Sequence, residues 1–590
     1  MEKLYFTSMI RILRMTVLLF IPSLVFGQGF LRTRGFDIVN EKGEKVLWRG
    51  MGLGGWMLQE GYMLHLGNIG PQFRIKAKIA ELIGQQRTDQ FYDDWLANDI
   101  RKVDIDSMAA WGFNAVRLPM HYRLYTLSVE EEPISGKNTW LPKGFALTDS
   151  LLSWCKANHM YLILDMHAAP GGQGNDLPIS DRDPSKPSLW DSEANRQKMV
   201  ALWQQLATRY AKEPWIGGYD IINEPNWGFT DSVHDRRGTA ETKNEPLRQL
   251  MKDITAAIRK VDPRHIIIIE GNGFGNNYRG VLPPWDDNMV LSFHKYWNQT
   301  TETSIRGFLD LREQYRLPLW LGESGENSDT WFTETIRLAE DHGIGWSWWP
   351  LKKMGGNNPL EIPYRPEYRK LVEYWSGRGN RPSEQEAIDA LQGVLRDIRL
   401  ENNHWHKEVT DAMFRQVYSD AAIPFLPHII GEETTIDAVD FDLGRQGIAY
   451  YDKDSGNYKG LGSGAAGNRG GVYRNDGVDI RIDSAAGSSS GKYYIFHIED
   501  GEWLQYTVNV EKEGEYVLGL TVASDADTGR LSFSSNQTME ARELKIPATG
   551  GMTEWRNVEV EDVYLDKGRN VLRIYAGKGG FNLKAIHFEL

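Results

Sequence analysis

The chain has 590 residues, too many for one ordinary domain, and its hydrophobic content of 41% is enough to fill more than one core. The formal net charge of -13 at pH 7 opposes a phosphate-binding surface, which needs clustered Lys and Arg, so we exclude nucleic acid as a partner. The one cysteine, Cys155, can form no intrachain disulfide. It lies in an apolar-periodic stretch, which predicts a buried core residue and not a nucleophile.

Residues 1–27 have the pattern of a signal peptide. Basic residues precede an apolar run from Met15 to Phe26, and small residues follow. The run is shorter than the roughly 20 apolar residues that a spanning helix needs. We therefore expect cleavage before Gln28 and a secreted monomer, located outside the cell, in a periplasm or on a cell surface, with no membrane span in the mature protein.

Residues 28–425 repeat a pattern of short apolar runs and amphipathic stretches. Helical spacing of apolar residues is clear in the stretches around 199–210 and 247–261. Strands too apolar to alternate, each followed by a helix, predict a parallel sheet that is buried on both faces. Eight such units predict a (β/α)8 barrel, an α/β fold of the TIM type, with large loop insertions. The apolar runs are residues 45–52, 112–119, 161–168, 216–225, 265–273, 289–297, 318–325 and 343–350.

Polar and aromatic residues follow these runs, where the carboxyl ends of the strands of a barrel form one shared cleft. A single cleft lined by these groups is therefore expected. In chain order they are Glu60, Arg117, His167, Asn223, Glu224, Glu270, His294, Tyr296, Glu323 and Trp349.

Two of the acidic residues, Glu224 and Glu323, follow the fourth and seventh strands, which face each other across an eight-stranded barrel. A pair of carboxyl groups about 5 to 5.5 Å apart can cleave a glycosidic bond with retention of configuration. Arg117 and Tyr296 are candidates to keep Glu323 ionised. Glu270 and Glu326 are weaker candidates for the same roles. No pairing of histidines indicates a metal, and we expect neither a metal nor another cofactor in catalysis.

These motifs together resemble glycoside hydrolase family 5. The resemblance rests on R-G-M-G-L-G-G-W at 49–56, N-A-V-R-L-P at 114–119, L-D-M-H at 164–167, I-N-E-P at 222–225, F-H-K-Y at 293–296, L-G-E at 321–323 and W-S-W-W at 346–349. It implies Glu224 as acid/base and Glu323 as nucleophile. It also implies a sugar subsite lined by Arg117, His167, Asn223, His294, Tyr296 and Trp349.

Two stretches, 54–60 and 165–174, are most similar to exo-acting β-1,3-glucanases and related β-1,6-glucanases. In that resemblance Glu60 would bind the terminal glucose. The expected activity is cleavage of a β-linked glucan, β-1,3 or β-1,6, by a secreted retaining enzyme that acts from chain ends. The alternatives are a cellulase, mannanase or β-glucosidase of the same family, and an inactive glycan-binding protein.

After a linker at 426–434, residues 435–590 change to short alternating strands with Gly, Ser, Asp and Asn between them, which predicts an antiparallel jelly-roll β-sandwich. The stretches 436–442, 449–452, 472–480, 500–506 and 580–586 resemble a family 6 carbohydrate-binding module. The resemblance implies sugar binding by Tyr473, Trp555 and Asn582, and it allows a structural calcium ion near Asp437.

Overall fold

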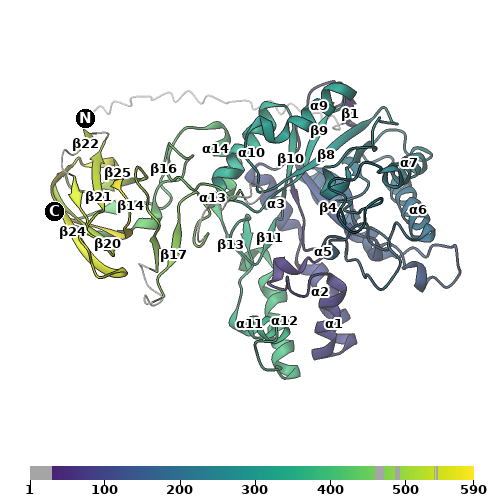
Figure 1. Cartoon of the computed structure of the whole chain (residues 1–590), viewed down its shortest axis with the longest axis horizontal. Coiled ribbons are helices and arrows are strands. Elements are labelled where there is room, and N and C mark those ends of the chain that lie inside the picture. Colours follow the sequence, from purple (N-terminus) through teal and green to yellow (C-terminus); the bar gives the residue numbers. More distant parts are fainter. Residues whose placement is uncertain (1–28, 459–470, 485–491, 537, 540–542) are drawn as a thin grey trace, which may run out of the picture.

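The computed structural model describes residues 29–458, 471–484, 492–536, 538–539 and 543–590. The purple-to-teal part of the chain forms a barrel with helices around it, and the green-to-yellow part forms strands on one side of that barrel (Figure 1). The predicted signal peptide lies outside the described residues. Within the described residues, no helix is long and apolar enough to cross a membrane.

Eight parallel strands close into a barrel, as predicted from the eight apolar runs, in the order β10-β3-β4-β5-β6-β7-β8-β9. Most of their residues are buried, because the side chains that face inward fill the barrel and those that face outward are covered by helices. The strands are β3 (Arg49–Gly52), β4 (Ala115–His121), β5 (Tyr161–Ala168), β6 (Ile216–Asp220), β7 (Ile266–Ile269), β8 (Met289–Lys295), β9 (Leu319–Gly325) and β10 (Gly345–Trp349).

Amphipathic helices follow the strands and cover the outside of the barrel. In the helix at 245–259 the buried residues include Leu247, Leu250, Met251, Ile254 and Ile258, on the face predicted from their spacing. The outer helices include α3 (Lys102–Trp111), α4 (Pro142–Ala157), α6 (Glu193–Tyr210), α7 (Glu245–Arg259), α9 (Arg306–Tyr315) and α10 (Asp329–Asp341).

Cys155, in α4, is free and fully buried in the core between barrel and helices, as predicted. Burial raises the pKa of its thiol, which therefore stays protonated.

Four helices from two distant parts of the chain pack together beside the barrel. They are α1 (Gln72–Ile83), α2 (Gln85–Asn98), α11 (Pro366–Trp375) and α12 (Glu384–Asp397), drawn below the barrel in Figure 1. Their apolar faces form a separate core that includes Ile75, Trp95 and Leu391. The insertion after β3 and the segment after β10 therefore stabilise each other, and both lie next to the β3 and β10 strand ends.

The C-terminal module consists of two sheets with a hydrophobic core between them, as predicted for a β-sandwich. One sheet contains β14 (His428–Ile430), β16 (Tyr450–Tyr451), β19 (Trp503–Val510), β21 (Arg530–Ser535), β22 (Thr538–Met539), β23 (Leu544–Lys545) and β25 (Gly568–Lys578). The other contains β15 (Glu433–Asp437), β17 (Ile480–Ile482), β18 (Tyr493–Ile495), β20 (Gly514–Ser524), β24 (Gly551–Leu565) and β26 (Asn582–Glu589). β14 lies within the predicted linker and pairs in parallel with β19.

Candidate active site

A pocket of about 610 Å³ lies at the carboxyl ends of the barrel strands, within the size range of small-molecule sites. It brings together seven of the residues predicted for one cleft, namely Glu60, His167, Glu224, His294, Tyr296, Glu323 and Trp349. Arg117 and Asn223 lie beneath the pocket, fully buried. Residues on or after β3, β5, β6, β8, β9 and β10 therefore meet at one place, as in other barrels of this type.

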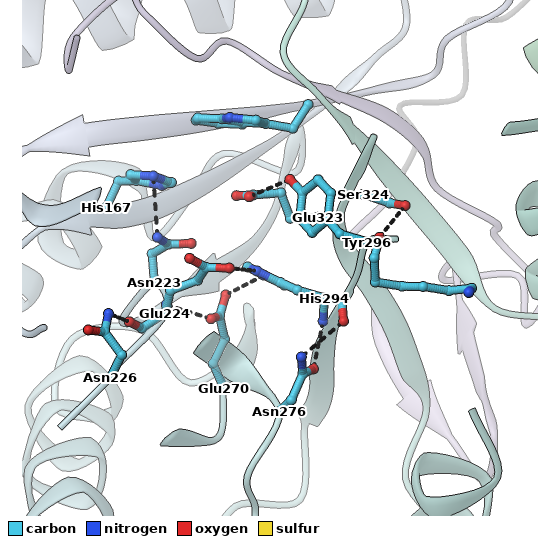
Figure 2. A network of polar contacts seen from close by, with 12 residues as sticks. His167, Asn223, Glu224, Asn226, Glu270, Asn276, His294, Tyr296, Glu323 and Ser324 are labelled. Carbon is cyan, nitrogen blue, oxygen red and sulfur yellow. Dashed lines mark hydrogen bonds and ion pairs between the residues drawn. The ribbon is translucent and has the colours of Figure 1, made fainter. Parts of the chain in front are cut away.

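Glu323, on β9, accepts two side-chain hydrogen bonds. Tyr296 donates from Oη to Oε1 over 2.8 Å (Figure 2), and Arg117 donates from Nη1 to Oε2 over 2.7 Å. Arg117 has no exposed surface, so its charge acts on Glu323 with little screening by water. The two partners predicted for Glu323 are therefore its partners in the structure.

Glu224, which follows β6, has a different environment. Burial raises the pKa of its carboxyl group to about 7, and the charges of Glu323 and Glu270 add to this rise. His294 opposes the rise through a 2.6 Å hydrogen bond from Nδ1 to Oε1 of Glu224 (Figure 2). The backbone N–H of Glu224 donates to Oε2 of Glu270 over 2.7 Å. Near neutral pH, Glu224 can therefore hold a proton.

One oxygen of Glu224 and one of Glu323 lie within 4.8 Å of each other, and a ring nitrogen of His294 lies within 4.8 Å of both. Such a group of three could in principle hold a metal ion. However, the buried guanidinium of Arg117 is already bonded to Glu323, and a divalent cation there would face this like charge. His294 is also bonded to two carboxyl groups, Glu224 and Glu270. The donor set fits a proton-transfer pair better than a metal centre.

Burial alone would lower the pKa of His294, but the carboxylates of Glu270 and Glu323 hold it well above its usual value. Both ring nitrogens then carry hydrogens, and they donate to Glu224 and to Oε1 of Glu270 over 3.1 Å. Because Oε1 of Glu224 accepts from this ring, the acidic proton of Glu224 belongs on its other oxygen. His294 therefore orients the carboxyl group of Glu224.

A second cluster of predicted residues forms the opposite wall. Nδ1 of His167 bonds Asp165 over 2.7 Å, and Nε2 lies 3.2 Å from the amide nitrogen of Asn223. Burial alone would lower the pKa of His167, but Asp165, with help from Glu60, raises it to about 10. The nearest oxygen of Glu60 is 3.8 Å from Nε2 of His167. This wall thus offers a cation and a carboxyl group to hydroxyl groups of a ligand, with the amide of Asn223 buried behind them.

Trp349 forms an aromatic face next to this wall. Its ring stacks on His167 with the centroids 4.9 Å apart and an angle of 8° between the planes. The glycines of the R-G-M-G-L-G-G-W stretch explain how it fits: a Cβ at Gly52 or Gly54 would lie 2.5 or 2.6 Å from atoms of the Trp349 ring. The glycines are needed because side chains at either position would displace the ring.

The sequence did not indicate the role of the buried carboxyl groups that surround Arg117. Asp165, Asp220 and Glu270 each place an oxygen within 3.2 Å of Nη2 of this arginine. Each of these residues lies in or directly after an apolar strand, so its position was visible in the sequence. However, an acidic residue at such a position gives the same sequence pattern whether its carboxyl group bonds a ligand or another side chain. Glu270, a weaker catalytic candidate from sequence, bonds Arg117, His294 and the Glu224 backbone instead.

Several lining residues of the pocket were also missed. They come from loops with no motif, where a single sequence carries no signal, and include Tyr62, Asp176, Arg237, Phe274, Asn276 and Trp297. Glu326, the other weaker catalytic candidate, lines the same pocket. Its Oε1 lies 3.2 Å from Nζ of Lys353, so it has a cationic partner of its own.

The three binding candidates of the C-terminal module lie in different surroundings. Tyr473 stacks on Tyr493 at 4.8 Å and donates to Asp440. Trp555 meets the edge of Tyr494 at 5.1 Å and donates to Asp483 over 3.2 Å. The amide nitrogen of Asn582 donates to the Met552 carbonyl, while its buried oxygen has no hydrogen-bond partner among the residues that the structure describes.

Among the described residues, the group of the module with metal-like geometry is Asp454, His497 and Glu499, which does not include Asp437. Calcium prefers six to eight oxygen ligands, and a set of three with one imidazole does not match that preference. We therefore derive no role for calcium from the geometry.

Comparison with known proteins agrees with this architecture. The model of the family described as "Cellulase (glycosyl hydrolase family 5)" matches residues 77–355. The model described as "Carbohydrate binding module (family 6)" matches residues 452–590. The two matches lie in the barrel and in the C-terminal sheets, in the predicted order.

Curated relatives point to the same family. A protein named beta-xylosidase from Phanerodontia chrysosporium is 31% identical over 397 residues, which are 61% of this chain and 78% of the relative. Endoglucanase C of Acetivibrio thermocellus is 23% identical over 43% of this chain and 84% of its own length. A probable glucan 1,3-beta-glucosidase A of Aspergillus clavatus is 28% identical over 51% of this chain and 66% of its own. The chain therefore belongs to glycosyl hydrolase family 5, as an O-glycosyl hydrolase with a family 6 carbohydrate-binding module after its barrel.

Proposed function

We propose that the protein hydrolyses a β-linked glucan with retention of configuration, using Glu224 as acid/base and Glu323 as nucleophile. The observation that carries this proposal is the approach of the two carboxyl groups, whose nearest oxygens lie within 4.8 Å. Retaining enzymes need about 5 to 5.5 Å between the carboxyl groups, whereas inverting enzymes need room for a water between them.

In the first step, an oxygen of Glu323 attacks the anomeric carbon, while Glu224 transfers its proton to the departing glycosidic oxygen. The bond to the leaving sugar breaks and a glycosyl ester with Glu323 forms. In the second step, Glu224 removes a proton from water, which attacks the anomeric carbon and releases Glu323. The raised pKa of Glu224, about 7, suits a group that must hold a proton in one step and accept one in the next.

Glu60, His167, Asn223 and Trp349 are proposed to bind the sugar on the non-reducing side of the cleaved bond. Trp349 would stack on the ring, and the polar groups would bond its hydroxyls. Binding at a chain end is supported by loop residues that border the pocket, such as Asp176 and Pro178. The proposed linkage is β-1,3 or β-1,6, and the relative named probable glucan 1,3-beta-glucosidase A supports the β-1,3 linkage.

Cleavage of β-xylosides is a second candidate, because the relative that is 31% identical over 78% of its length is named beta-xylosidase. Xylose lacks the hydroxymethyl group of glucose. The two candidates therefore differ in whether the pocket accommodates that group.

The C-terminal module is proposed to hold the enzyme on an insoluble glycan, which would raise its local concentration there. Tyr473, Trp555 and Asn582 remain the proposed contacts, and secretion remains the proposed localisation. Calcium near Asp437 stays a proposal from resemblance alone. Oligomeric state is proposed to be monomeric.

The proposal is tested with aryl β-glucoside and β-xyloside, laminarin, pustulan, cellulose and mannan as substrates, identifying the first products by anomeric NMR. We expect the β-anomer first. Glu323→Gln should abolish turnover and leave binding intact, and Glu224→Gln should retain hydrolysis only of substrates with good leaving groups. An α-product, or normal hydrolysis by Glu323→Gln, would refute the mechanism.

A further inference from the structure

The segment that follows the Glu323 strand is bonded to the C-terminal module. We define the β9–α10 segment as residues 326–330, which comprise the loop after β9 and the first two residues of α10. The module lies on the side of the barrel that carries α10, α13 (Lys407–Met413) and α14 (Arg415–Tyr418) (Figure 1). Four consecutive residues of the β9–α10 segment, 327–330, form hydrogen bonds to residues between 450 and 475 of the module.

Asn327 is the most strongly held of them. Its side chain bonds the backbone of Asn457 twice, donating from Nδ2 over 2.8 Å and accepting at Oδ1 over 2.7 Å. Its carbonyl accepts from Nδ2 of Asn475 over 2.6 Å, and the carbonyl of Asn475 accepts from the N–H of Asp329 over 2.7 Å. Asn327 and Asp329 are both nearly fully buried, so these bonds are not weakened by competing water.

Thr330 and Ser328 add to this contact. The hydroxyl groups of Thr330 and Tyr450 share a hydrogen bond of 2.5 Å, and Ser328 donates to the carbonyl of Ser455. The module therefore contacts the β9–α10 segment at every residue after Glu326. A flexible tether would need none of these bonds.

Glu326 connects the β9–α10 segment to the sugar pocket. Its backbone has a positive φ of 53°, a conformation that costs energy for a residue other than glycine and needs support from its surroundings. Its carbonyl accepts from Nε1 of Trp297 over 3.1 Å, and its side chain pairs with Lys353 over 3.2 Å. Trp297 and Glu326 both line the pocket.

Glu326 is linked to Tyr62 through Lys353. Nζ of Lys353, which bonds Glu326, lies 5.5 Å from the centroid of the Tyr62 ring, and Glu326 and Tyr62 both line the pocket. The hydroxyl of Tyr62 in turn accepts from Nε1 of Trp349 over 3.1 Å. A continuous chain of contacts thus runs from the module through Glu326 and Tyr62 to the aromatic face of the sugar site.

We propose that the C-terminal module is a structural part of the active site, in which Asn475 and its neighbours fix the β9–α10 segment so that Glu326 holds Tyr62 and Trp349 in place. Glu326 is then a positioning residue that acts through Tyr62. This inference rests on the proposed function, because it assigns Trp349 to the sugar subsite. It gives the module an effect on small soluble substrates, which tethering to an insoluble glycan cannot produce.

The experiment uses the full chain and an aryl β-glycoside that the unmodified protein hydrolyses. Asn475→Ala removes the donor to the Asn327 carbonyl. We expect kcat/KM to fall about tenfold, mainly through a rise in KM, because the aromatic face contacts the sugar before and during the reaction. Asn557→Ala is the control: this exposed residue of β24 bonds Thr521 far along the module sheet. It should change kcat/KM by less than about twofold, as is usual for exposed sites.

A double-mutant cycle separates positioning from general damage. If Asn475 acts through Glu326, the effect of Asn475→Ala should nearly vanish in a Glu326→Gln background. Tyr450→Phe, which removes the bond to Thr330, provides a second variant should Asn475→Ala not fold. Normal kcat/KM in both Asn475→Ala and Tyr450→Phe, or an undiminished effect in the Glu326→Gln background, would overturn the inference. Inactivity of the unmodified protein on every aryl glycoside would instead refute the proposed function.

Discussion

Replacing Glu224 by Gln should stabilise the protein at alkaline pH and not at acidic pH. Burial is the chief cause that raises the pKa of Glu224 in the folded protein to about 7, from an ordinary value of 4.5. Below pH 4.5 the carboxyl group is protonated in both the folded and the unfolded chain, so it does not affect the free energy of unfolding. As pH rises, the unfolded chain loses the proton first, and the folded protein loses stability until the pH exceeds about 7.

The difference between these two pKa values corresponds to about 3 kcal/mol, because one pKa unit is worth about 1.4 kcal/mol. Gln at position 224 carries no charge at any pH and can still accept from His294 through its amide oxygen. We therefore expect the variant and the unmodified protein to unfold at similar temperatures at pH 4.5, and the variant to unfold several degrees higher at pH 8.

Thermal unfolding followed by circular dichroism over pH 4.5 to 8 measures this difference. Glu313→Gln is a suitable control, because Glu313 is an exposed glutamate of α9 on the outside of the barrel. Its unfolding temperature should follow that of the unmodified protein throughout. An offset for Glu224→Gln that does not change with pH would refute the reasoning, since it would mean that burial leaves the titration of Glu224 unperturbed.

Three further outcomes are expected from the same structure. The value of kcat/KM should fall above about pH 7, where Glu224 loses its proton, and a profile that stays flat to pH 9 would contradict its assignment as the acid. Tyr296→Phe removes one donor from Glu323 and should lower kcat about 10- to 100-fold, measured by single-turnover kinetics that resolve glycosyl-enzyme formation. Asp329→Asn should raise the unfolding temperature more at pH 8 than at pH 4, because burial, together with the charges of Asp476 and Glu408, raises the pKa of Asp329. Equal increases in unfolding temperature at both pH values would argue against a buried, protonated Asp329.

The barrel could be predicted because its strands carry a strong local signal. Runs such as Ile266–Ile269 are too apolar to alternate, and the glycine-rich or polar residues after them indicate where each strand ends. The order of the runs then determines which strand ends are neighbours, so Glu224 and Glu323 could be expected to meet. The same reasoning predicted that Arg117 and Tyr296 would contact Glu323, because all three follow strands of one barrel.

The contacts between the two parts of the chain could not be predicted in this way. Asn327 and Asn475 are 148 positions apart, and neither belongs to a repeating pattern. An asparagine in a loop gives the same sequence pattern whether its side chain caps a turn, bonds a sugar or joins two domains. The separate surroundings of Tyr473 and Trp555 show the same limit, because strand spacing predicts a sandwich but does not determine which loops meet at its end.

The two glutamates illustrate how identical side chains can be given opposite tasks. Both are nearly buried, at 7% exposure for Glu224 and 6% for Glu323, but their hydrogen-bond partners differ. Among the described residues, the guanidinium of Arg117 bonds Glu323 directly and is connected to the carboxyl group of Glu224 through Glu270 and His294. Replacing Arg117 by Met should therefore harm nucleophilic attack more than proton transfer, so that an activated leaving group, which needs no acid, would not rescue the variant.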